Sequence, residues 1–226
     1  MNDKKNNNEE NTKIPCDKNT FYTRYIKRIL DILLSAVAII ILSPIFLVVS
    51  ILEIFIHGVP IFYVQERPGL NEKIFKLYKF RSMNNKKDKE GKLLPGAQRV
   101  TPFGKFLRRF SLDELPELFC ILSGKMSIIG PRPLLPMSLP FYSKRHHMRH
   151  SIRPGLACVP LKPMKTWSWN DQFENDIWYV ENVSFIIDVK MVFAVIREAI
   201  AGSEYRVDDT RGEFDGTNLY EDAYKM

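Results

Sequence analysis

The residue types best suited to chemistry gather in residues 108–116, which read Arg-Arg-Phe-Ser-Leu-Asp-Glu-Leu-Pro. Asp113 and Glu114 are adjacent carboxylates at the start of a predicted helix, and such a pair behind two arginines could hold Mg²⁺ and a phosphate together. A purely structural explanation exists as well, because Ser111 and Glu114 have the spacing of a capping box. Pro116 counts against it, since it would fall in the second turn of a helix capped by Ser111 but in the first turn of one capped by Asp113.

Further cations stand beside rigid turns or at the end of a predicted strand. The planar guanidinium of arginine suits a diphosphate, because its paired N–H donors match two phosphate oxygens. One such residue is more often an ordinary surface charge, but four basic clusters beside stiff turns together indicate phosphate binding. The candidate phosphate-binding residues are Lys79, Arg81, Arg108, Arg132 and Arg153.

Common signatures of nucleotide-dependent and metal-dependent enzymes are absent from the sequence, including GxGxxG, Walker A, HExxH and GxSxG. The DxD pair of many sugar-nucleotide transferases is also missing, which argues against a conventional glycosyltransferase site. His146 and His150 are four residues apart, but nothing pairs with them as a further ligand and their neighbours are cationic. The sequence therefore predicts no histidine-based metal site.

The composition predicts a folded domain, and the net charge predicts an anionic partner. The 226 residues are 45% hydrophobic, enough for one domain with a buried core. Three cysteines at unrelated spacings exclude a disulfide scaffold and indicate reduced thiols. Residues 20–202 hold 26 basic and 15 acidic side chains, a net charge of +11. Such a balance favours nucleic acid, acidic lipid or a phosphorylated substrate as the partner.

One segment predicts contact with a membrane. Residues 29–56 form a largely apolar run in which only Asp31 and Glu53 are charged, and as a helix they would measure about 42 Å, enough to cross a hydrocarbon core. Ser43-Pro44 lies in the middle, where proline disturbs a helix. The segment is either a kinked spanning helix or a re-entrant hairpin of two half-helices. We favour the hairpin, because spanning would place a basic, thiol-bearing domain outside the cytosol.

The remaining chain predicts an α+β fold, with the membrane helix-break-helix followed by a small, mostly helical cytosolic domain that contains a short β-hairpin. Thr101-Pro102 is a helix start, with Thr as the N-cap and Pro at the first position. The expected strands are residues 60–66 and 73–80, and the expected helical segments are residues 101–110, 111–124, 134–150 and 184–201, the last ending at Gly202. The expected parts are a polar leader (1–21), a re-entrant membrane helix (22–58), a catalytic domain with amphipathic interfacial helices (59–202) and a loose acidic tail (203–226).

Seven motifs in order give the chain a specific resemblance. They are Lys27-Arg28 with Asp31, Ser43-Pro44, Gln65-x-Arg67-Pro68-Gly69, Lys79-Phe80-Arg81-Ser82-Met83, Ser111-Leu112-Asp113-Glu114-Leu115-Pro116, Gly130-Pro131-Arg132-Pro133 and Arg153-Pro154-Gly155. The series resembles the bacterial sugar transferase family, the small monotopic phosphoglycosyl transferases that initiate glycan assembly on polyprenyl phosphate. The resemblance covers roughly residues 22–200.

The resemblance implies an activity, a cofactor and partners. Such enzymes use Mg²⁺ to transfer a sugar 1-phosphate from a UDP-sugar to undecaprenyl phosphate, on the cytoplasmic face of the bacterial inner membrane, and release UMP. Carried onto this sequence, Asp113 would be the nucleophile that forms a covalent phosphosugar intermediate, and Glu114 its dyad partner, with both contacting the metal. The candidate cations would position phosphates, and Ser43-Pro44 would bend the membrane helix. Membrane lipids are expected partners and nucleic acid is not, while a homo-oligomer stays open.

One segment departs from the family pattern, and alternatives remain. Residues 156–165 lack the glycine and arginine usual in the family after Arg153-Pro154-Gly155, and Lys162 and Lys165 are the only nearby cations. The sugar specificity is therefore open, and an inactive paralogue is one alternative. A membrane-anchored basic module that binds acidic lipid or nucleic acid is another, and a spanning protein with an outward-facing domain is a third.

Overall fold

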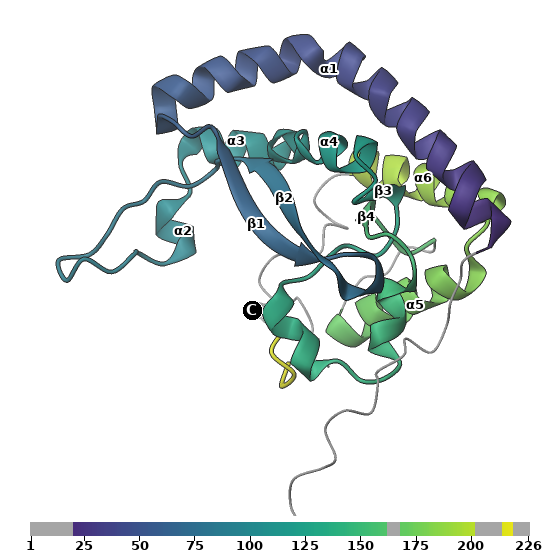
Figure 1. Cartoon of the computed structure of the whole chain (residues 1–226). Helices are drawn as coiled ribbons and strands as arrows, with labels where there is room; N and C mark the ends of the chain where they lie inside the picture. The colour runs from purple at the N-terminus through teal and green to yellow at the C-terminus, as the bar shows by residue number, and fades with distance from the viewer. Residues whose placement is uncertain (1–19, 162–167, 202–213, 219–226) are drawn as a thin grey trace, which may run out of the picture.

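A computed structural model describes residues 20–161, 168–201 and 214–218 (Figure 1). Its helices are α1 (Lys27–His57), α2 (Gly96–Arg99), α3 (Pro102–Arg109), α4 (Glu117–Leu122), α5 (Trp169–Asn182) and α6 (Phe185–Ala201), and its strands are β1 (Phe62–Pro68), β2 (Ile74–Phe80), β3 (Ser127–Ile129) and β4 (Gly155–Ala157). Short 3₁₀ segments cover Leu70–Glu72, Leu112–Glu114, Pro136–Phe141 and His146–Ser151, and a π-helical turn, Tyr22–Ile26, precedes α1. The fold mixes helices with two small sheets. The sequence predicted this mixed class and the first sheet, the β1–β2 hairpin.

The predicted hairpin is present as the antiparallel pair β1–β2, in which Phe62 pairs with Phe80 and Pro68 with Ile74. Alternate residues of a strand face the same side, so Leu77 and Lys79 share a face. Leu77 is buried with residues of α4, and fully burying such a side chain contributes roughly 1.5–3 kcal/mol. This packing brings the end of β2, and with it Lys79, against the segment that contains the paired carboxylates.

Helix α1 is continuous through the Ser43-Pro44 pair and arches over the molecule (Figure 1). Proline at position 44 removes the backbone donor that would bond the carbonyl of Ile40. The Ser43 hydroxyl donates to that same carbonyl at 2.8 Å and so replaces the missing bond. The expected division into two half-helices separated by a break is not confirmed, because a neighbouring side chain supplies the lost hydrogen bond.

The N-terminal end of α1 is joined to the domain by buried polar contacts. The Asp31 carboxylate accepts hydrogen bonds from the Ser127 hydroxyl and the Ile128 backbone N–H, each at 3.0 Å. Lys27 Nζ lies 2.6 Å from an Asp188 carboxylate oxygen at the start of α6. Asp31 and Lys27 are both buried, so these contacts fix this end of the helix on β3 and α6.

The C-terminal end of α1 is joined to the same domain by a second polar cluster. The His57 ring lies between the Glu53 carboxylate at 2.9 Å and the Thr101 hydroxyl at 3.0 Å. Thr101 is the predicted N-cap of α3, and its hydroxyl also accepts from the Gly104 N–H at 2.9 Å. The cap that starts α3 therefore also holds the end of α1.

A parallel pair of very short strands, β3 and β4, joins two of the proline-glycine turns. Gly130 N–H donates to the Ala157 carbonyl at 3.0 Å, and Gly155 N–H donates to the Pro131 carbonyl at 3.0 Å. A Cβ atom on Gly155 would lie 2.1 Å from the Gly130 nitrogen, so only glycine permits this approach. The sequence analysis predicted neither strand, nor helix α5.

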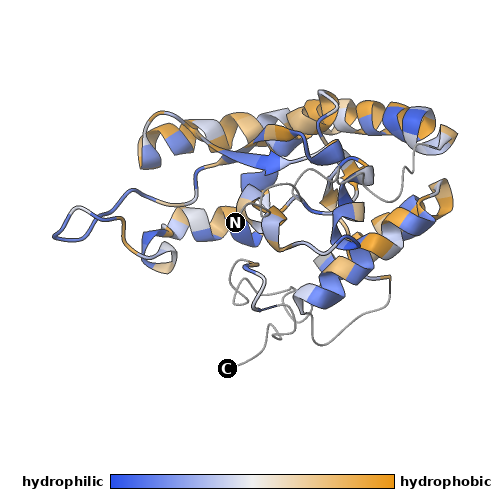
Figure 2. Ribbon diagram, turned by 60° about the horizontal axis from the view of Figure 1, so that its bottom comes forward, coloured by the Kyte–Doolittle hydropathy of each residue, from blue (hydrophilic) through white to orange (hydrophobic). Residues whose placement is uncertain are grey.

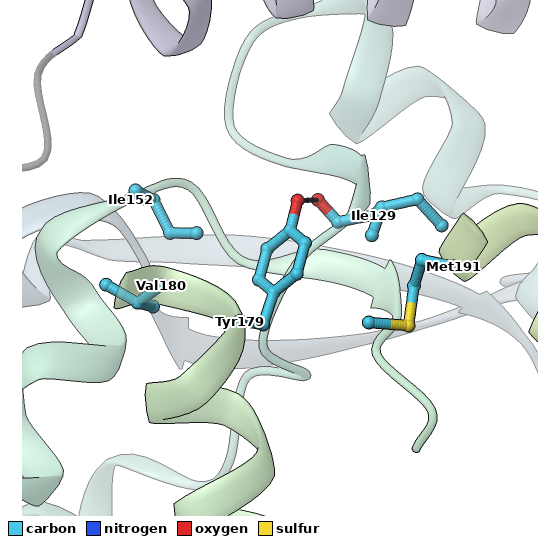
Figure 3. Close-up of a cluster of buried hydrophobic side chains, with 5 residues drawn as sticks. All are labelled: Ile129, Ile152, Tyr179, Val180 and Met191. Carbon is cyan, nitrogen blue, oxygen red and sulfur yellow. Dashed lines mark hydrogen bonds between the residues drawn. The ribbon is translucent and has the colours of Figure 1, made fainter. Parts of the chain in front are cut away.

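Helices α5 and α6 pack on β3 around one buried cluster, which Figure 3 draws. Its members are Ile129, Ile152, Tyr179, Val180 and Met191. The Tyr179 hydroxyl donates to the Ile129 carbonyl at 3.3 Å, so the one polar atom that ring carries into the core has a partner (Figure 3). Phe214, in the tail expected to be loose, is buried in a second cluster with Tyr142 and Phe173.

Two predicted helices have a different form. Residues 111–124 form a 3₁₀ turn and then α4 rather than one helix, because Pro116, between the two, has no N–H to bond the Leu112 carbonyl. Ser111 has a left-handed backbone, with φ of 53°, and makes no capping hydrogen bond. The capping-box explanation for Ser111 and Glu114 is therefore wrong. Residues 134–150 form two 3₁₀ segments instead of a helix, since Pro136 and Pro140 lack the N–H that a helix needs. The leader (1–19), Lys162, Lys165, Gly202 and most of the tail lie outside the described residues.

Apolar side chains remain exposed along two helices. Helix α1, the long helix across the top of Figure 2, is mostly apolar, and Tyr22–His57 is long and apolar enough to cross a membrane. Helix α6 also exposes apolar residues, among them Phe185, Ile186 and Phe193. Monomeric soluble proteins rarely leave so much contiguous apolar surface in water.

Candidate active site

The two candidate catalytic carboxylates lie in the 3₁₀ turn Leu112–Glu114, between α3 and α4. The left-handed Ser111 turns the chain at the end of α3, and the Glu114 carboxylate reaches Lys79 at the end of the β-hairpin. Asp113 is buried, and the Glu114 side chain is 17% exposed. Two negative groups at this depth need nearby positive charge, because burying an unpaired charge is costly.

Glu114 receives that charge from two elements. Lys79 Nζ, at the end of β2, lies 2.7 Å from Glu114 Oε1, and the Arg132 guanidinium pairs with the same carboxylate. Burial alone would raise the pKa of Glu114, but Arg132 and Lys79 outweigh it and hold this pKa well below its usual range. Glu114 is therefore a carboxylate that stays ionised at any working pH.

Asp113 has a different environment. Burial, and then the negative charge of Glu114, raise the pKa of Asp113, while Lys79 and Arg108 oppose the rise. Among the described residues, no lysine, arginine or histidine forms an ion pair with Asp113. A carboxylate that is desolvated and not held by a cation has the character of a nucleophile or a metal ligand.

The structure brings three of the five candidate phosphate-binding residues to this site. Lys79 and Arg132 contact Glu114 directly, and the charge of Arg108, in the last turn of α3, acts on Asp113. Arg108 Nε also donates to the Ser82 hydroxyl at 2.9 Å, which ties α3 to the segment after β2. Three cations from three separate elements therefore surround the two carboxylates.

The other two candidates bond to backbone carbonyls elsewhere. Arg81 donates to the His57 carbonyl at 2.9 Å and the Pro60 carbonyl at 3.1 Å, at the C-terminal end of α1. Arg153 donates to the Gly124 carbonyl at 2.9 Å, just beyond α4. Among the residues that the structure describes, neither arginine forms an ion pair with Asp113 or Glu114.

A third carboxylate, which the sequence analysis did not single out, lies beside the pair. Glu117 is buried in the first turn of α4, and its Oε1 lies 3.2 Å from Lys79 Nζ. Burial raises the pKa of Glu117, with Lys79 opposing the rise. The signal was available in the sequence, because Glu114 and Glu117 are three residues apart at the start of a helix and so face the same side.

Among the described residues of the site, the carboxylates are the side chains best suited to hold Mg²⁺. The described residues contain no group of three or more His, Cys, Asp or Glu side chains arranged to bind a metal ion. Mg²⁺ in phosphate-handling sites needs less than that, since it keeps several waters and binds one or two carboxylates together with substrate phosphates. Asp113, with Glu114 beside it, fits this kind of open site.

Comparison with known proteins gives the family. The model of the bacterial sugar transferase family matches residues 22–202, which is most of the chain. The chain belongs to the bacterial sugar transferase family. This membership confirms the resemblance stated from the seven motifs and the prediction that the protein is a transferase.

Three relatives illustrate the range of the family. An uncharacterized sugar transferase of Bacillus subtilis, EpsL, is 42% identical over 144 residues, 63% of this chain and 71% of the relative. The UDP-N-acetylgalactosamine-undecaprenyl-phosphate N-acetylgalactosaminephosphotransferase of Aeromonas hydrophila is 35% identical over 187 residues, 79% of this chain and 44% of the relative. The UDP-glucose:undecaprenyl-phosphate glucose-1-phosphate transferase of Klebsiella pneumoniae is 33% identical over 183 residues, 75% of this chain and 39% of the relative. The chain thus spans less than half the length of these two relatives whose names state a reaction.

Proposed function

We propose that the protein transfers a sugar 1-phosphate from a UDP-sugar to undecaprenyl phosphate, giving undecaprenyl-diphosphate-sugar and UMP. The observation that carries this proposal is the contrast within the site: a buried Asp113 with no ion-pair partner among the described residues, next to Glu114 held by Lys79 and Arg132. A carboxylate can attack the phosphorus of an anionic diphosphate only where positive charge offsets the repulsion. Two relatives named as transferases from UDP-sugars to undecaprenyl phosphate support the substrate classes.

In the proposed first step, an Asp113 carboxylate oxygen attacks the phosphorus that carries the sugar. A bond forms between that oxygen and the β-phosphorus, the bond from the β-phosphorus to the bridging oxygen breaks, and UMP leaves with the electron pair. Lys79, Arg108 and Arg132 bind the diphosphate and offset the charge that accumulates on it. Mg²⁺, when bound at Asp113 and Glu114, would add Lewis-acid polarisation of a phosphoryl oxygen.

In the proposed second step, an oxygen of undecaprenyl phosphate attacks the same phosphorus. The bond from Asp113 to phosphorus breaks, the carboxylate is regenerated, and the lipid diphosphate-sugar is released. Splitting one difficult displacement into two easier ones is the usual advantage of a covalent intermediate. Glu114, fixed in its ionised form by Lys79 and Arg132, keeps these cations at the position where the diphosphate must lie.

We further propose that α1 enters and leaves one leaflet, with the catalytic domain on the cytoplasmic face of the inner membrane. Its N-terminal end bonds to β3 and α6 through Asp31 and Lys27, and its C-terminal end bonds to α3 through His57. Both ends are therefore held on one domain, whereas a spanning helix would place them on opposite sides of the bilayer. The apolar middle of the helix is left exposed for lipid, and the exposed apolar residues of α6 favour contact with the membrane surface.

Labelling tests this topology. Single cysteines at Thr20 and Val59, in a variant whose native cysteines are replaced by serine, would flank the membrane helix. We expect a membrane-impermeant maleimide to label neither position in intact cells with a permeable outer membrane, and both after the inner membrane is opened. Labelling of one position in intact cells would show that α1 spans the bilayer and would contradict this part of the proposal.

UMP release tests the activity. Purified protein in nanodiscs, supplied with Mg²⁺, undecaprenyl phosphate and a panel of UDP-sugars, should release UMP with at least one donor. Asp113→Asn should lower the rate by about 10³-fold or more while the protein still enters the membrane. Asp215→Asn, the same change at an exposed aspartate outside the site, should release UMP at the wild-type rate. Equal turnover by Asp113→Asn and the wild type would contradict the proposal.

A further inference from the structure

The side chain that pairs with Glu114 extends from a backbone held at several points. Arg132 lies between Pro131 and Pro133, both buried, and its own side chain is 48% exposed. The prolines restrict their own φ angles and lack N–H groups, so the backbone of this segment offers three carbonyls but a single N–H, that of Arg132. Gly155 N–H donates to the Pro131 carbonyl at 3.0 Å, and Arg149 Nη2 donates to the Arg132 carbonyl at 2.8 Å.

Arg149 is itself fixed on every side. Its side chain is 1% exposed, and Asp176 Oδ2 lies 2.8 Å from its Nε and 2.7 Å from its Nη2. Its Nη1 donates to the Tyr142 hydroxyl at 2.7 Å, and the guanidinium lies 5.0 Å from the centre of the Phe173 ring. Nη2 thus contacts both the Asp176 carboxylate and the Arg132 carbonyl. Because Asp176 lies on α5, this helix helps to determine where the backbone of Arg132 lies.

A second arginine, Arg67, donates a hydrogen bond to the next backbone carbonyl of this segment, that of Pro133. Arg67 Nη1, at the end of β1, donates to the Pro133 carbonyl at 3.1 Å, and Arg67 Nη2 donates to the Gln65 side chain at 2.7 Å. Two guanidinium groups therefore hold consecutive carbonyls of the segment that presents Arg132. No other residue type offers several N–H donors in one rigid plane at this depth.

We propose that Arg149 is a positioning residue for the transfer reaction: by holding the Arg132 carbonyl, it places the Arg132 guanidinium on Glu114 and on the incoming phosphate. The inference rests on the proposed function, because Arg132 matters to turnover only if the site handles a diphosphate. Reacting groups that are misplaced by about 1 Å can lose a hundredfold in rate. Lysine at position 149 could still pair with Asp176, but its single ammonium group lacks the planar fork that bonds both partners at once.

A double-mutant cycle separates this role from simple support of the fold. Arg149→Lys should lower kcat by about 10- to 100-fold when Arg132 is present. In an Arg132→Gln background, where no guanidinium remains to be positioned, Arg149→Lys should change kcat by less than about twofold, since the two effects are then not additive. Arg145→Lys is the matched control, because Arg145 pairs with Glu174 of the same helix α5 on the exposed surface and should leave kcat unchanged.

The position of Arg132 can also be read without turnover. A structure of Arg149→Lys should show the Arg132 guanidinium displaced from Glu114, while the Asp113 and Glu114 backbone stays in place. If Arg149→Lys does not fold, Asp176→Asn, which keeps the shape of the partner but removes its charge, replaces it in both measurements and should give the same pattern with a smaller fall in kcat.

Equal loss of kcat in both backgrounds, or an Arg132 that has not moved, would overturn the inference and leave Arg149 a purely structural residue. Absence of UMP release from the wild type with every donor would instead contradict the proposed function. The structure of the variant would still decide whether Arg149 positions Arg132.

Discussion

Two arginine–carboxylate pairs in this protein have the same chemistry and opposite surroundings. Arg132 and Glu114 are 48% and 17% exposed at the side chain, and Arg149 and Asp176 are each 1% exposed. The exposed fraction decides what each pair can do. A partly solvated guanidinium can exchange one anion for another at small cost, whereas a fully buried one cannot leave its carboxylate without stranding both charges.

The two pairs are also connected, because Arg149 holds the carbonyl of Arg132. The buried pair supplies fixed geometry and the exposed pair supplies an exchangeable charge, which is the combination that phosphoryl transfer requires. A substitution in the buried pair should therefore be seen first in stability, and a substitution in the exposed pair first in turnover.

Breaking the buried pair should have the largest effect on stability. Asp176→Ala leaves the Arg149 guanidinium buried without its carboxylate, and such a change costs about 3–5 kcal/mol of unfolding free energy. Glu174→Ala, which removes an exposed partner of Arg145 from the same helix, should cost less than about 1 kcal/mol. Thermal unfolding in detergent compares the two, and equal melting temperatures would contradict the assignment of Arg149–Asp176 as the rigid pair.

Breaking the exposed pair should act on the reaction instead. Arg132→Gln removes a cation aimed at the diphosphate, and the loss of one such group costs about a hundredfold in kcat. The free energy of unfolding should change by less than about 1 kcal/mol, because the arginine is half exposed. Arg145→Gln provides the control for a surface arginine. A large fall in stability with unchanged kcat would reverse the roles given to the two pairs.

The smallest of the expected effects is a change in the pH at which kcat falls on the acid side of the pH–rate profile. Burial and the charge of Glu114 raise the pKa of Asp113, so the ionised nucleophile is lost as pH falls through a value above the ordinary 3.8. Glu114 stays ionised there, because Arg132 and Lys79 lower its pKa even against burial. Glu114→Gln removes the like charge beside Asp113, so we expect the acid limb of kcat to move to lower pH.

The control for this shift is the same exchange one turn further along the chain. Glu117→Gln alters the other partner of Lys79, and Glu117 is not among the main charges that act on Asp113, so the acid limb should move less than in Glu114→Gln. An acid limb that moves upward in Glu114→Gln, or that moves only in Glu117→Gln, would show that Asp113 is not the group that titrates.

Local patterns predicted the elements whose signals lie within a few residues. Two short β-like runs joined by the turn signal Arg67-Pro68-Gly69 identified the β1–β2 hairpin, and Thr101-Pro102 identified the start of α3, which the Thr101 hydroxyl caps as expected. Ser111 shows the limit of such patterns, because its spacing to Glu114 fits a capping box while its backbone is left-handed and its side chain makes no capping hydrogen bond. Helix α5 carries a capping box of Ser168 and Asp171 that could have identified it.

Contacts between distant residues could not be predicted in this way. The strands β3 and β4 have three residues each and gain their pairing only from the close approach of Gly130 and Gly155. The site could likewise be predicted only in part. The residue types indicated that Asp113 and Glu114 are reactive, but they did not indicate which cations lie close to them in the folded chain. Arg81 looked equivalent to Lys79, and only the folded chain shows that its Nη1 donates to the His57 and Pro60 carbonyls at the end of α1.

Trapping the covalent intermediate tests the central claim most directly. The protein would be incubated with Mg²⁺ and a UDP-sugar that supports UMP release, in the absence of undecaprenyl phosphate, then digested and examined by mass spectrometry. We predict that the peptide containing Asp113 gains the mass of the sugar phosphate, that Asp113→Asn gains nothing, and that undecaprenyl phosphate removes the added mass. Release of UMP by turnover with no adduct on the wild type, or an adduct that persists in Asp113→Asn, would contradict the account.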